Sequence, residues 1–283
     1  MKTDANNVYT AITPKRRDCV YTNTLGTIKK MKKISFIISI FLLTGCCKEP
    51  KYLKNGLTTK ANKVTETILK VNRDSLNIQN IDTISIIEKF YNSNDQITKR
   101  KENIVFDNQT MEIDYFYNKS KKLEKEIVKL PFDTSTVNYF YKDTLLYKTS
   151  MKTINQEFEF EQISTHNYNR KNKLTEVLTS QFYLDLASKD TFANSMEVNK
   201  YNTNEKLKES KLSNFVYPER SKRTLYKYKC GRLFSTKNYN DKDSLISISN
   251  FEYVFDEFNN WTEMKTKESN KLKYIRKREI DYK

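Results

Sequence analysis

Few side chains in this 283-residue chain belong to the types that usually carry chemistry. There is one histidine, His166, so a multi-histidine metal site is excluded and imidazole catalysis is not expected. His166 precedes Tyr168 by two residues, where comparable segments carry tyrosine, and we interpret it as a substitute for an aromatic side chain. The sequence contains no G-x-S-x-G, P-loop or H-E-x-x-H motif. We therefore assign no catalytic residue, no metal ligand and no cofactor.

Carboxylates and aromatic rings leave two other chemistries open. A glycosidase needs only two suitably placed acids, so a glycan hydrolase stays as the least favoured alternative. The alternating segment 157–161, Glu-Phe-Glu-Phe-Glu, predicts instead a strand with a solvated acidic face. Aromatic rings could stack on sugars, and the candidates are Trp261, the sole tryptophan, and Tyr183. Packing of Trp261 within the sheet's own apolar face is the favoured alternative.

An export signal lies near the N-terminus. Residues 34–43 (ISFIISIFLL) form a short apolar run preceded by Lys32 and Lys33. This is typical of a secretory signal and is too short to span a bilayer, which needs about 20 residues. The sequence Leu-Thr-Gly-Cys follows at 43–46 and resembles the lipobox of bacterial lipoproteins. That resemblance implies a lipidated Cys46 as the first residue of the mature chain.

The signal divides the chain into three parts. Residues 1–45 are interpreted as an upstream extension plus the signal peptide, with Met31 as the expected true start. Residues 46–62 are a lipidated tether, and residues 63–283 are a single β-repeat domain. The lipoprotein resemblance also implies the outer rather than the inner membrane, because Cys47, and not aspartate, is at the second position of the mature chain. A Cys47–Cys230 disulfide stays open as an alternative to free thiols.

The charge is basic, at a formal +16, but it is spread along the chain. The densest run is Arg276-Lys277-Arg278. Nucleic-acid binding needs a clustered basic stripe, so no nucleic-acid partner is expected. The favoured interpretation is a solvated basic surface that attracts anionic lipid or polysaccharide.

The body of the chain repeats. An anchor aromatic recurs every 24 to 33 residues, followed by a polar turn and then by an apolar residue. The anchors are Tyr91, Tyr117, Tyr141, Tyr168, Tyr201, Tyr228 and Phe255. Each unit predicts a β-hairpin whose anchor and second preceding residue share one face. The fold class predicted is all-β: an antiparallel meander of about seven tandem hairpins, forming an extended curved sheet or a partly open barrel.

The last repeat carries a family resemblance. Residues 253–262, Tyr-Val-Phe-Asp-Glu-Phe-Asn-Asn-Trp-Thr, resemble the Y-x-Y-D-x-x-G-N-W-T unit of YD/RHS-like repeat proteins. The closing Lys-Arg-Glu-Ile-Asp-Tyr at 277–282 resembles the final strand of bacterial lipoproteins built from such units. Asn259 stands where the family has a turn glycine. The resemblance implies an extended, curved sheet.

These observations predict a lipid-anchored binding or scaffolding protein of the cell envelope, not an enzyme. Its expected partners are the membrane, through the lipid anchor, and a polysaccharide or an envelope protein. The alternative is a periplasm-facing carrier or assembly factor that holds an apolar ligand.

Overall fold

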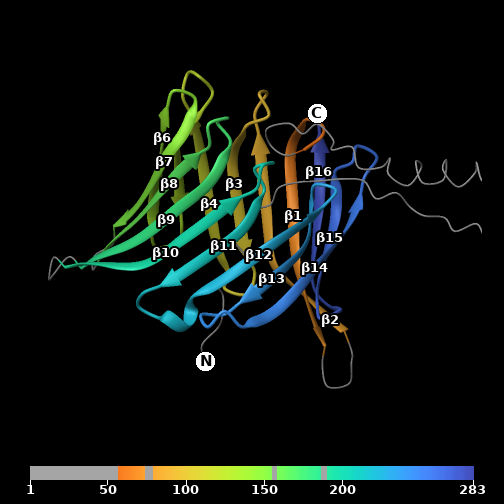
Figure 1. Ribbon diagram of the computed structural model, residues 1–283. Coiled ribbons are helices and arrows are strands. Elements are labelled where there is room, and N and C mark those ends of the chain that lie inside the picture. Colours follow the sequence, from red (N-terminus) through yellow and green to blue (C-terminus); the bar gives the residue numbers. More distant parts are fainter. Residues whose placement is uncertain (1–56, 74–78, 155–157, 186–189) are drawn as a thin grey trace, which may run out of the picture.

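The protein is an antiparallel β-barrel (Figure 1). The computed structural model describes residues 57–73, 79–154, 158–185 and 190–283. These contain sixteen strands and one 3-10 helix, η1. The elements are β1 (Ala61–Arg73), β2 (Gln79–Tyr91), β3 (Ile97–Ile104), β4 (Gln109–Tyr117), β5 (Leu123–Lys129), β6 (Thr134–Lys142), β7 (Leu145–Ile154), β8 (Phe158–Tyr168), β9 (Leu174–Asp185), β10 (Thr191–Tyr201), β11 (Leu207–Asn214), η1 (Pro218–Arg220), β12 (Lys222–Lys229), β13 (Arg232–Tyr239), β14 (Leu245–Phe255), β15 (Trp261–Glu268) and β16 (Lys271–Tyr282).

Every strand pairs with its neighbours in sequence, and β1 pairs with β16 to close the barrel. The prediction of an antiparallel meander agrees with this topology, but the prediction of about seven hairpins in an extended or partly open sheet is wrong. It missed the pairing of β1 with β16, two strands that carry no anchor aromatic before a turn. Their pairing gives partners to the N–H and C=O groups that an open sheet would leave at its two edges.

Closure is sealed by a small apolar cluster where the chain enters β1. Leu57, Ala61 and Val64 are buried there, and Tyr91 and Ile280 pack against them. The cluster joins β1 to β2 on one side and to β16 on the other, so it fixes the first and last strands together.

Turns of one design connect many of the hairpins. In the turn after β8, Asn169 Oδ1 accepts hydrogen bonds from the N–H groups of Lys171 (2.9 Å) and Lys173 (3.1 Å). The Asn169 N–H donates to the Lys173 carbonyl (2.9 Å), which closes a five-residue loop. The fourth residue of six such turns has φ between 56° and 62°: Asp95, Lys121, Asn172, Glu205, Asp243 and Asn259. Asn259 therefore adopts the left-handed conformation usually given to glycine.

The anchor aromatics mark β-bulges. In seven hairpins the register shifts by one residue directly before the anchor, from Tyr91 to Phe255. The anchor hydroxyls also join neighbouring hairpins. Tyr117 Oη donates to the Ile97 carbonyl at 2.8 Å, and Tyr141 Oη donates to the Leu123 carbonyl at 2.9 Å. The repeated aromatic in the sequence thus corresponds to a repeated β-bulge and to a repeated tyrosine hydrogen bond between neighbouring hairpins, which we call the clasp.

The two faces of the wall follow from strand register. Glu66 is fully buried and points into the barrel, and paired residues on adjacent strands point to the same side. Its cross-strand partners Ile87 and Arg278 therefore also face the lumen. The same alternation puts Tyr117 inside, half-buried, and Phe116 outside, 45% exposed. The predicted sharing of one face by the anchor and its second preceding residue agrees with this arrangement, because Tyr115 and Tyr117 both lie on the inner side of β4.

Candidate functional site

A group of charged side chains lines the lumen along β16, β1, β2 and β3, and we call it the luminal charge cluster. Its members are Glu66, Lys89, Arg100, Glu102, Arg276 and Arg278. They come from neighbouring strands at matched register, because Arg278 pairs with Glu66 across β16–β1 and Lys89 pairs with Arg100 across β2–β3. Barrel closure is therefore what assembles the cluster.

Glu66 is its hub. Glu66 Oε1 accepts hydrogen bonds from Lys89 Nζ (2.9 Å) and from Arg278 Nε (3.2 Å) and Nη2 (2.6 Å). Burial alone would raise the pKa of Glu66, but the charges of Arg278, Lys89 and Arg276 together hold it well below its ordinary value. The carboxylate is therefore ionised throughout the physiological range.

Arg278 is locked in place from two sides. Glu66 holds its guanidinium in the plane, and the ring of Trp261 lies under the guanidinium carbon, 3.6 Å from the ring centroid. Trp261 itself is only 2% exposed. The contacts of Trp261 are thus those of a buried packing residue, and its ring offers no open face for the predicted sugar stacking.

Glu102 is equally occupied. Its Oε1 accepts a hydrogen bond from Ser85 Oγ at 2.8 Å, and its Oε2 pairs with Arg100 Nη2. Arg100 keeps a buried Nε without a hydrogen-bond partner. Both carboxylates of the cluster are therefore engaged by cations, and neither is placed as a free acid or base.

Arg276 differs from Arg278. Its nearest charged group is Glu66, with Arg276 Nη1 3.9 Å from Glu66 Oε2, and its side chain is 12% exposed. Among the described residues its guanidinium has no hydrogen bond. Burial lowers the pKa of Arg276, which identifies it as a cation held in a poorly solvated place.

Tyrosines surround the cluster on the inner wall. Burial raises the pKa of Tyr91 to about 12, and it raises the pKa values of Tyr115, Tyr139 and Tyr253 further. Tyr139 Oη donates a 2.7 Å hydrogen bond to Glu126, whose pKa is raised by burial. Burial is the largest cause of each of these shifts, because these groups lie on a poorly solvated stretch of the inner wall.

The rest of the lumen is polar. Small hydroxyl side chains recur at buried positions on the inner face of many strands, and we call them the hydroxyl belt. They are Ser85, Ser135, Ser164, Ser195, Ser210, Thr236 and Ser249. Several bond to luminal neighbours, for example Ser195 Oγ to Gln181 Oε1 at 2.7 Å and Ser210 Oγ to Glu197 Oε1 at 2.7 Å. The lumen therefore offers hydrogen bonds rather than an apolar trough.

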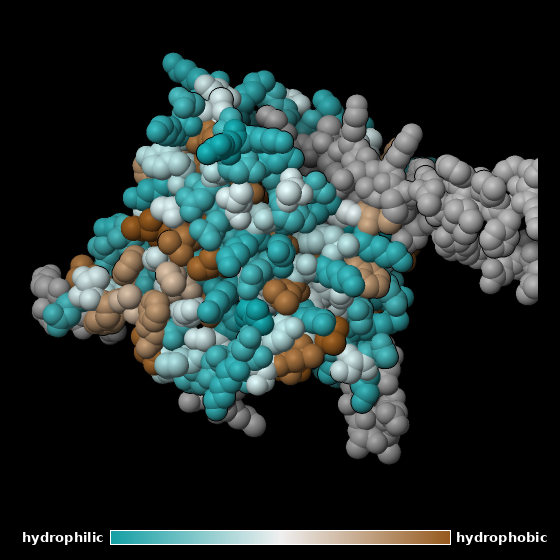
Figure 2. All heavy atoms as spheres, in the orientation of Figure 1, coloured by the Kyte–Doolittle hydropathy of each residue, from teal (hydrophilic) through white to brown (hydrophobic). Residues whose placement is uncertain are grey.

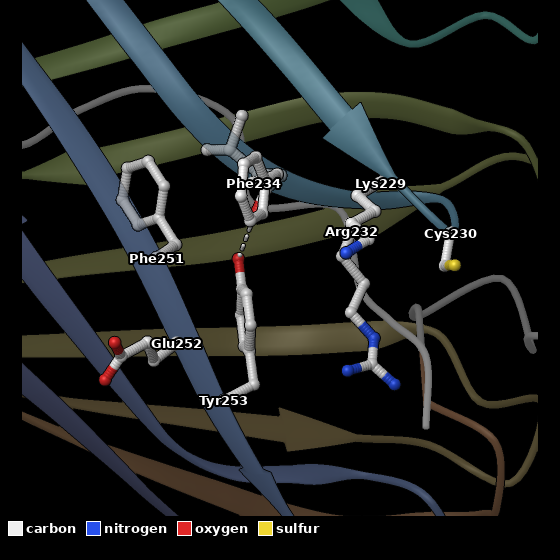
Figure 3. A pocket seen from close by; sticks show the side chains of 8 residues that line it. Lys229, Cys230, Arg232, Phe234, Phe251, Glu252 and Tyr253 are labelled. Carbon is white, nitrogen blue, oxygen red and sulfur yellow. Dashed lines mark hydrogen bonds between the residues drawn. The ribbon is translucent and has the colours of Figure 1, made fainter. Parts of the chain in front are cut away.

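A separate pocket lies at the turn between β12 and β13, with β14 beside it (Figure 3). Its volume is about 250 Å³, and Arg232, Phe234, Phe251 and Tyr253 are among its lining residues. Arg232 lies over the ring of Phe255, 3.8 Å from the centroid. Ligand pockets usually measure about 300–1,000 Å³, so this pocket is too small to be the main binding site.

The outer face carries ladders of ion pairs. On β3 and β4, Lys99 pairs with Glu112 at 2.8 Å and Lys101 pairs with the same carboxylate at 3.8 Å. The Lys99–Glu112 hydrogen bond raises the pKa of Lys99 and lowers that of Glu112, as expected for a water-exposed pair. Further outer pairs are Lys63–Glu88, Lys129–Asp114, Lys152–Glu159, Arg223–Asp243 and Lys267–Glu252. Figure 2 shows one side of the outer surface, which is mostly hydrophilic with separate apolar patches.

The other candidates from the sequence occupy scattered places. Cys46, the predicted lipidation site, lies outside the described residues. Tyr183 is on β9 and packs against Phe160 on β8, with ring centroids 5.2 Å apart. Neither strand contributes to the luminal charge cluster. His166 faces the lumen on β8, and burial lowers its pKa. Cys230 forms a disulfide, and no second cysteine lies within the described ranges.

The luminal charge cluster was missed in the sequence. The run Arg276-Lys277-Arg278 was interpreted as a solvated surface, but strand alternation turns both arginines inward and Lys277 outward. The signal that could have found it is the sequence Arg-x-Arg in the last strand together with Glu66, flanked by Val64 and Ile68 at alternate positions in the first strand. A carboxylate in an apolar inward stripe needs a buried cation as partner.

Within the described part of the chain, no helix is long and apolar enough to cross a bilayer. The same residues hold no group of three or more His, Cys, Asp or Glu side chains placed to bind a metal ion.

Comparison with known proteins gives a likeness of fold only. No family model and no curated protein matches the chain. A porin-like protein from Bacteroides uniformis ATCC 8492 is similar in structure, with a TM-score of 0.49 and 10% identity over 78% of this chain and 98% of that one. A porin-like protein from Bacteroides vulgatus ATCC 8482 has a TM-score of 0.48 and 11% identity over 80% and 99%.

The predicted membership of a lipoprotein family with YD/RHS-like repeats is wrong. The sheet closes on itself through β1 and β16, whereas that family implies an extended sheet. The misleading signal was the repeated turn-and-anchor unit, which builds hairpins equally well in a barrel.

Proposed function

We propose that this protein is a water-exposed barrel of the cell envelope that binds a polar ligand in its lumen, tethered to the membrane rather than crossing it as a pore. The observation that carries the proposal is the set of ion pairs on the outer face. A barrel that spans a bilayer presents an apolar outer band about 25 Å tall, and each Lys or Arg at its middle costs about 2–4 kcal/mol.

Charged residues occur at outward positions around the whole barrel and not only near its rims. Outward lysines near the centres of their strands are Lys101, Lys125, Lys237 and Lys265. At about 2–4 kcal/mol each, these four would together cost about 8–16 kcal/mol if they faced lipid, which is comparable to the whole stability of a typical domain. The tether would be a lipid on Cys46, as the signal and lipobox-like sequence suggest.

The content of the lumen favours binding of a polar ligand over the other candidates. The hydroxyl belt and the charged cluster do not suit an apolar cargo. Glu66 and Glu102 are the carboxylates of the cluster, and cations engage both of them. Neither is free to exchange a proton, as an acid of a hydrolase must be, so the contacts of the cluster support binding.

The test compares the native protein with the Cys46→Ser variant, both expressed in a bacterial host with the signal retained. We expect mass spectrometry to find diacylglycerol on Cys46, and we expect the variant either to be released as a folded barrel without detergent or to stall with its signal uncleaved. We also expect no channel conductance from the native protein in planar bilayers. A variant that stays in the membrane fraction after alkaline extraction although its signal has been cleaved, or a native protein that conducts ions, would refute the proposal.

A further inference from the structure

The luminal charge cluster holds more positive than negative charge. Lys89, Arg100, Arg276 and Arg278 face only Glu66 and Glu102. Adding the nearest charged groups of the inner wall does not change the excess. The charges of Arg232 and Arg276 both act on the Tyr253 hydroxyl, and the charge of Arg100 acts on the Glu126 carboxylate. Counting Arg232 and Glu126 with the cluster thus adds one positive and one negative charge.

A buried excess of cations is unfavourable unless an anion compensates it. Lysine can lose its proton under such pressure, whereas a guanidinium stays charged. Burial and Arg278 both oppose the charged form of Arg276, and yet Arg276 has no deprotonated form to adopt. A negative group bound beside Arg276 would compensate this excess of positive charge.

Three of the cations still have donors to offer. Arg276 has no hydrogen bond among the described residues. Arg100 has a buried Nε without a hydrogen-bond partner. Lys89 donates one of the three protons of its ammonium to Glu66. The three are close together. Lys89 Nζ and Arg276 Nη1 lie 2.9 Å and 3.9 Å from the two oxygens of one carboxylate, and Arg100 is the cross-strand partner of Lys89.

We propose that Arg276, Lys89 and Arg100 form a binding site for the oxyanion of a small polar ligand, a carboxylate or a phosphate group, on the inner wall of the barrel. This rests on the luminal binding proposed above and names its chemistry. A guanidinium matches a two-oxygen anion with two parallel N–H donors, and a nearby ammonium adds charge without demanding direction. Luminal tyrosines around the cluster supply ring faces and hydroxyls for the body of the ligand.

Arg278 is not part of this site. Its Nε and Nη2 already bond to Glu66, and its flat face covers Trp261. It positions the carboxylate that in turn orients Lys89. Arg276 and Arg278 are thus alike in type and in strand but differ in role, and this difference makes the proposal testable.

The experiment is isothermal titration calorimetry on the folded mature barrel with three probes: glucuronate, glucose and inorganic phosphate. Glucuronate and glucose share a sugar body and differ by the carboxylate. We expect glucuronate and phosphate to bind and glucose to bind at least tenfold more weakly. Tighter binding of glucuronate than of phosphate would show that the sugar body is also recognised.

The matched variants are Arg276→Gln and Lys277→Gln, neighbouring residues on β16 that lose the same charge on opposite faces. Arg276→Gln should weaken oxyanion binding at least tenfold, Lys277→Gln should leave it within twofold, and Arg276→Lys should recover part of it. Without ligand, Arg276→Gln should melt no lower than the wild type, because it removes one of three cations that share the single carboxylate of Glu66. This thermal readout separates a binding residue from a structural one.

Two results would overturn the site. One is that the folded wild-type barrel binds neither oxyanion, or that Arg276→Gln binds both oxyanions as tightly as the wild type. The other is glucose binding as tightly as glucuronate, which would leave luminal binding standing and remove the oxyanion site. The proposed function itself is tested separately, by membrane extraction of the Cys46→Ser variant and by conductance measurements on the native protein.

Discussion

Replacing Glu66 by glutamine removes the one negative charge that three buried cations share. Three hydrogen bonds from Lys89 and Arg278 end on its Oε1, and its side chain has no solvent exposure. Charge-assisted bonds contribute about 1.5–3 kcal/mol each, but they do not add when they share one acceptor. Breaking a buried pair by removing one partner costs about 3–5 kcal/mol, which is the value we expect here.

Urea unfolding followed by tyrosine and tryptophan fluorescence measures this loss. For a barrel of this size, a loss of that order lowers the melting temperature by roughly 6–20 °C. The control is Glu112→Gln, the same change on the outer face, where Lys99 and Lys101 are partners and the side chain is 30% exposed. Exposed pairs contribute about 0–1 kcal/mol, so this variant should stay within that range.

The combination of Glu66→Gln with Arg276→Gln tests the electrostatic reasoning directly. Removal of one uncompensated cation should recover part of the stability lost in Glu66→Gln, so the two changes should not be additive. A Glu66→Gln variant no less stable than Glu112→Gln, or strict additivity in the double variant, would refute the account of the cluster as a buried set of cations around a single carboxylate.

Three further outcomes are expected. Tyr117→Ala should cost about 2–4 kcal/mol in chemical denaturation, because it loses inner-wall packing and the clasp to Ile97, whereas Phe116→Ala on the outer face should cost under about 1 kcal/mol; equal losses would contradict the assignment of faces. Lys121→Gly should raise stability by about 0.5–1 kcal/mol, because φ is 59° there, and Asn172→Gly should change it less, since asparagine tolerates that conformation; thermal melts that show no gain for Lys121→Gly would contradict the turn geometry. Burial raises the pKa of Tyr117 to about 12 from 10, so its contribution is complete below pH 10 and is lost as the pH rises towards 12; a spectroscopic titration in which the luminal tyrosines ionise near pH 10 without unfolding would contradict a shielded inner wall.

The sequence was informative wherever structure is local. The anchor aromatics and the polar residues after them locate seven bulged hairpin ends, because bulge, turn and clasp all lie within about 30 residues. Asn259 was recognised as the residue in the glycine position for the same reason. These features depend on backbone chemistry that a short segment determines by itself.

Closure and the charge cluster depend on partners that are distant in sequence. The segment around Glu66 calls for a buried cation but does not indicate which one, and its partner Arg278 lies 212 residues later. Without that pairing, the inward direction of Arg276 and the burial of Trp261 could not be inferred either. An Arg-Lys-Arg run looks like solvated surface until register assigns its members to opposite faces of a strand.

The pairing of the first strand with the last also orders the steps of folding. Glu66 can meet Lys89 as soon as β2 has formed beside β1, since only 23 residues separate them, but its second partner, Arg278, lies in the last strand, β16. Until then one edge of β1 is bare and ready to pair with any passing strand, including one from another molecule. A chain that lacks β16 would therefore keep this unpaired edge of β1, and pairing of the C-terminal strand with β1 is what removes it.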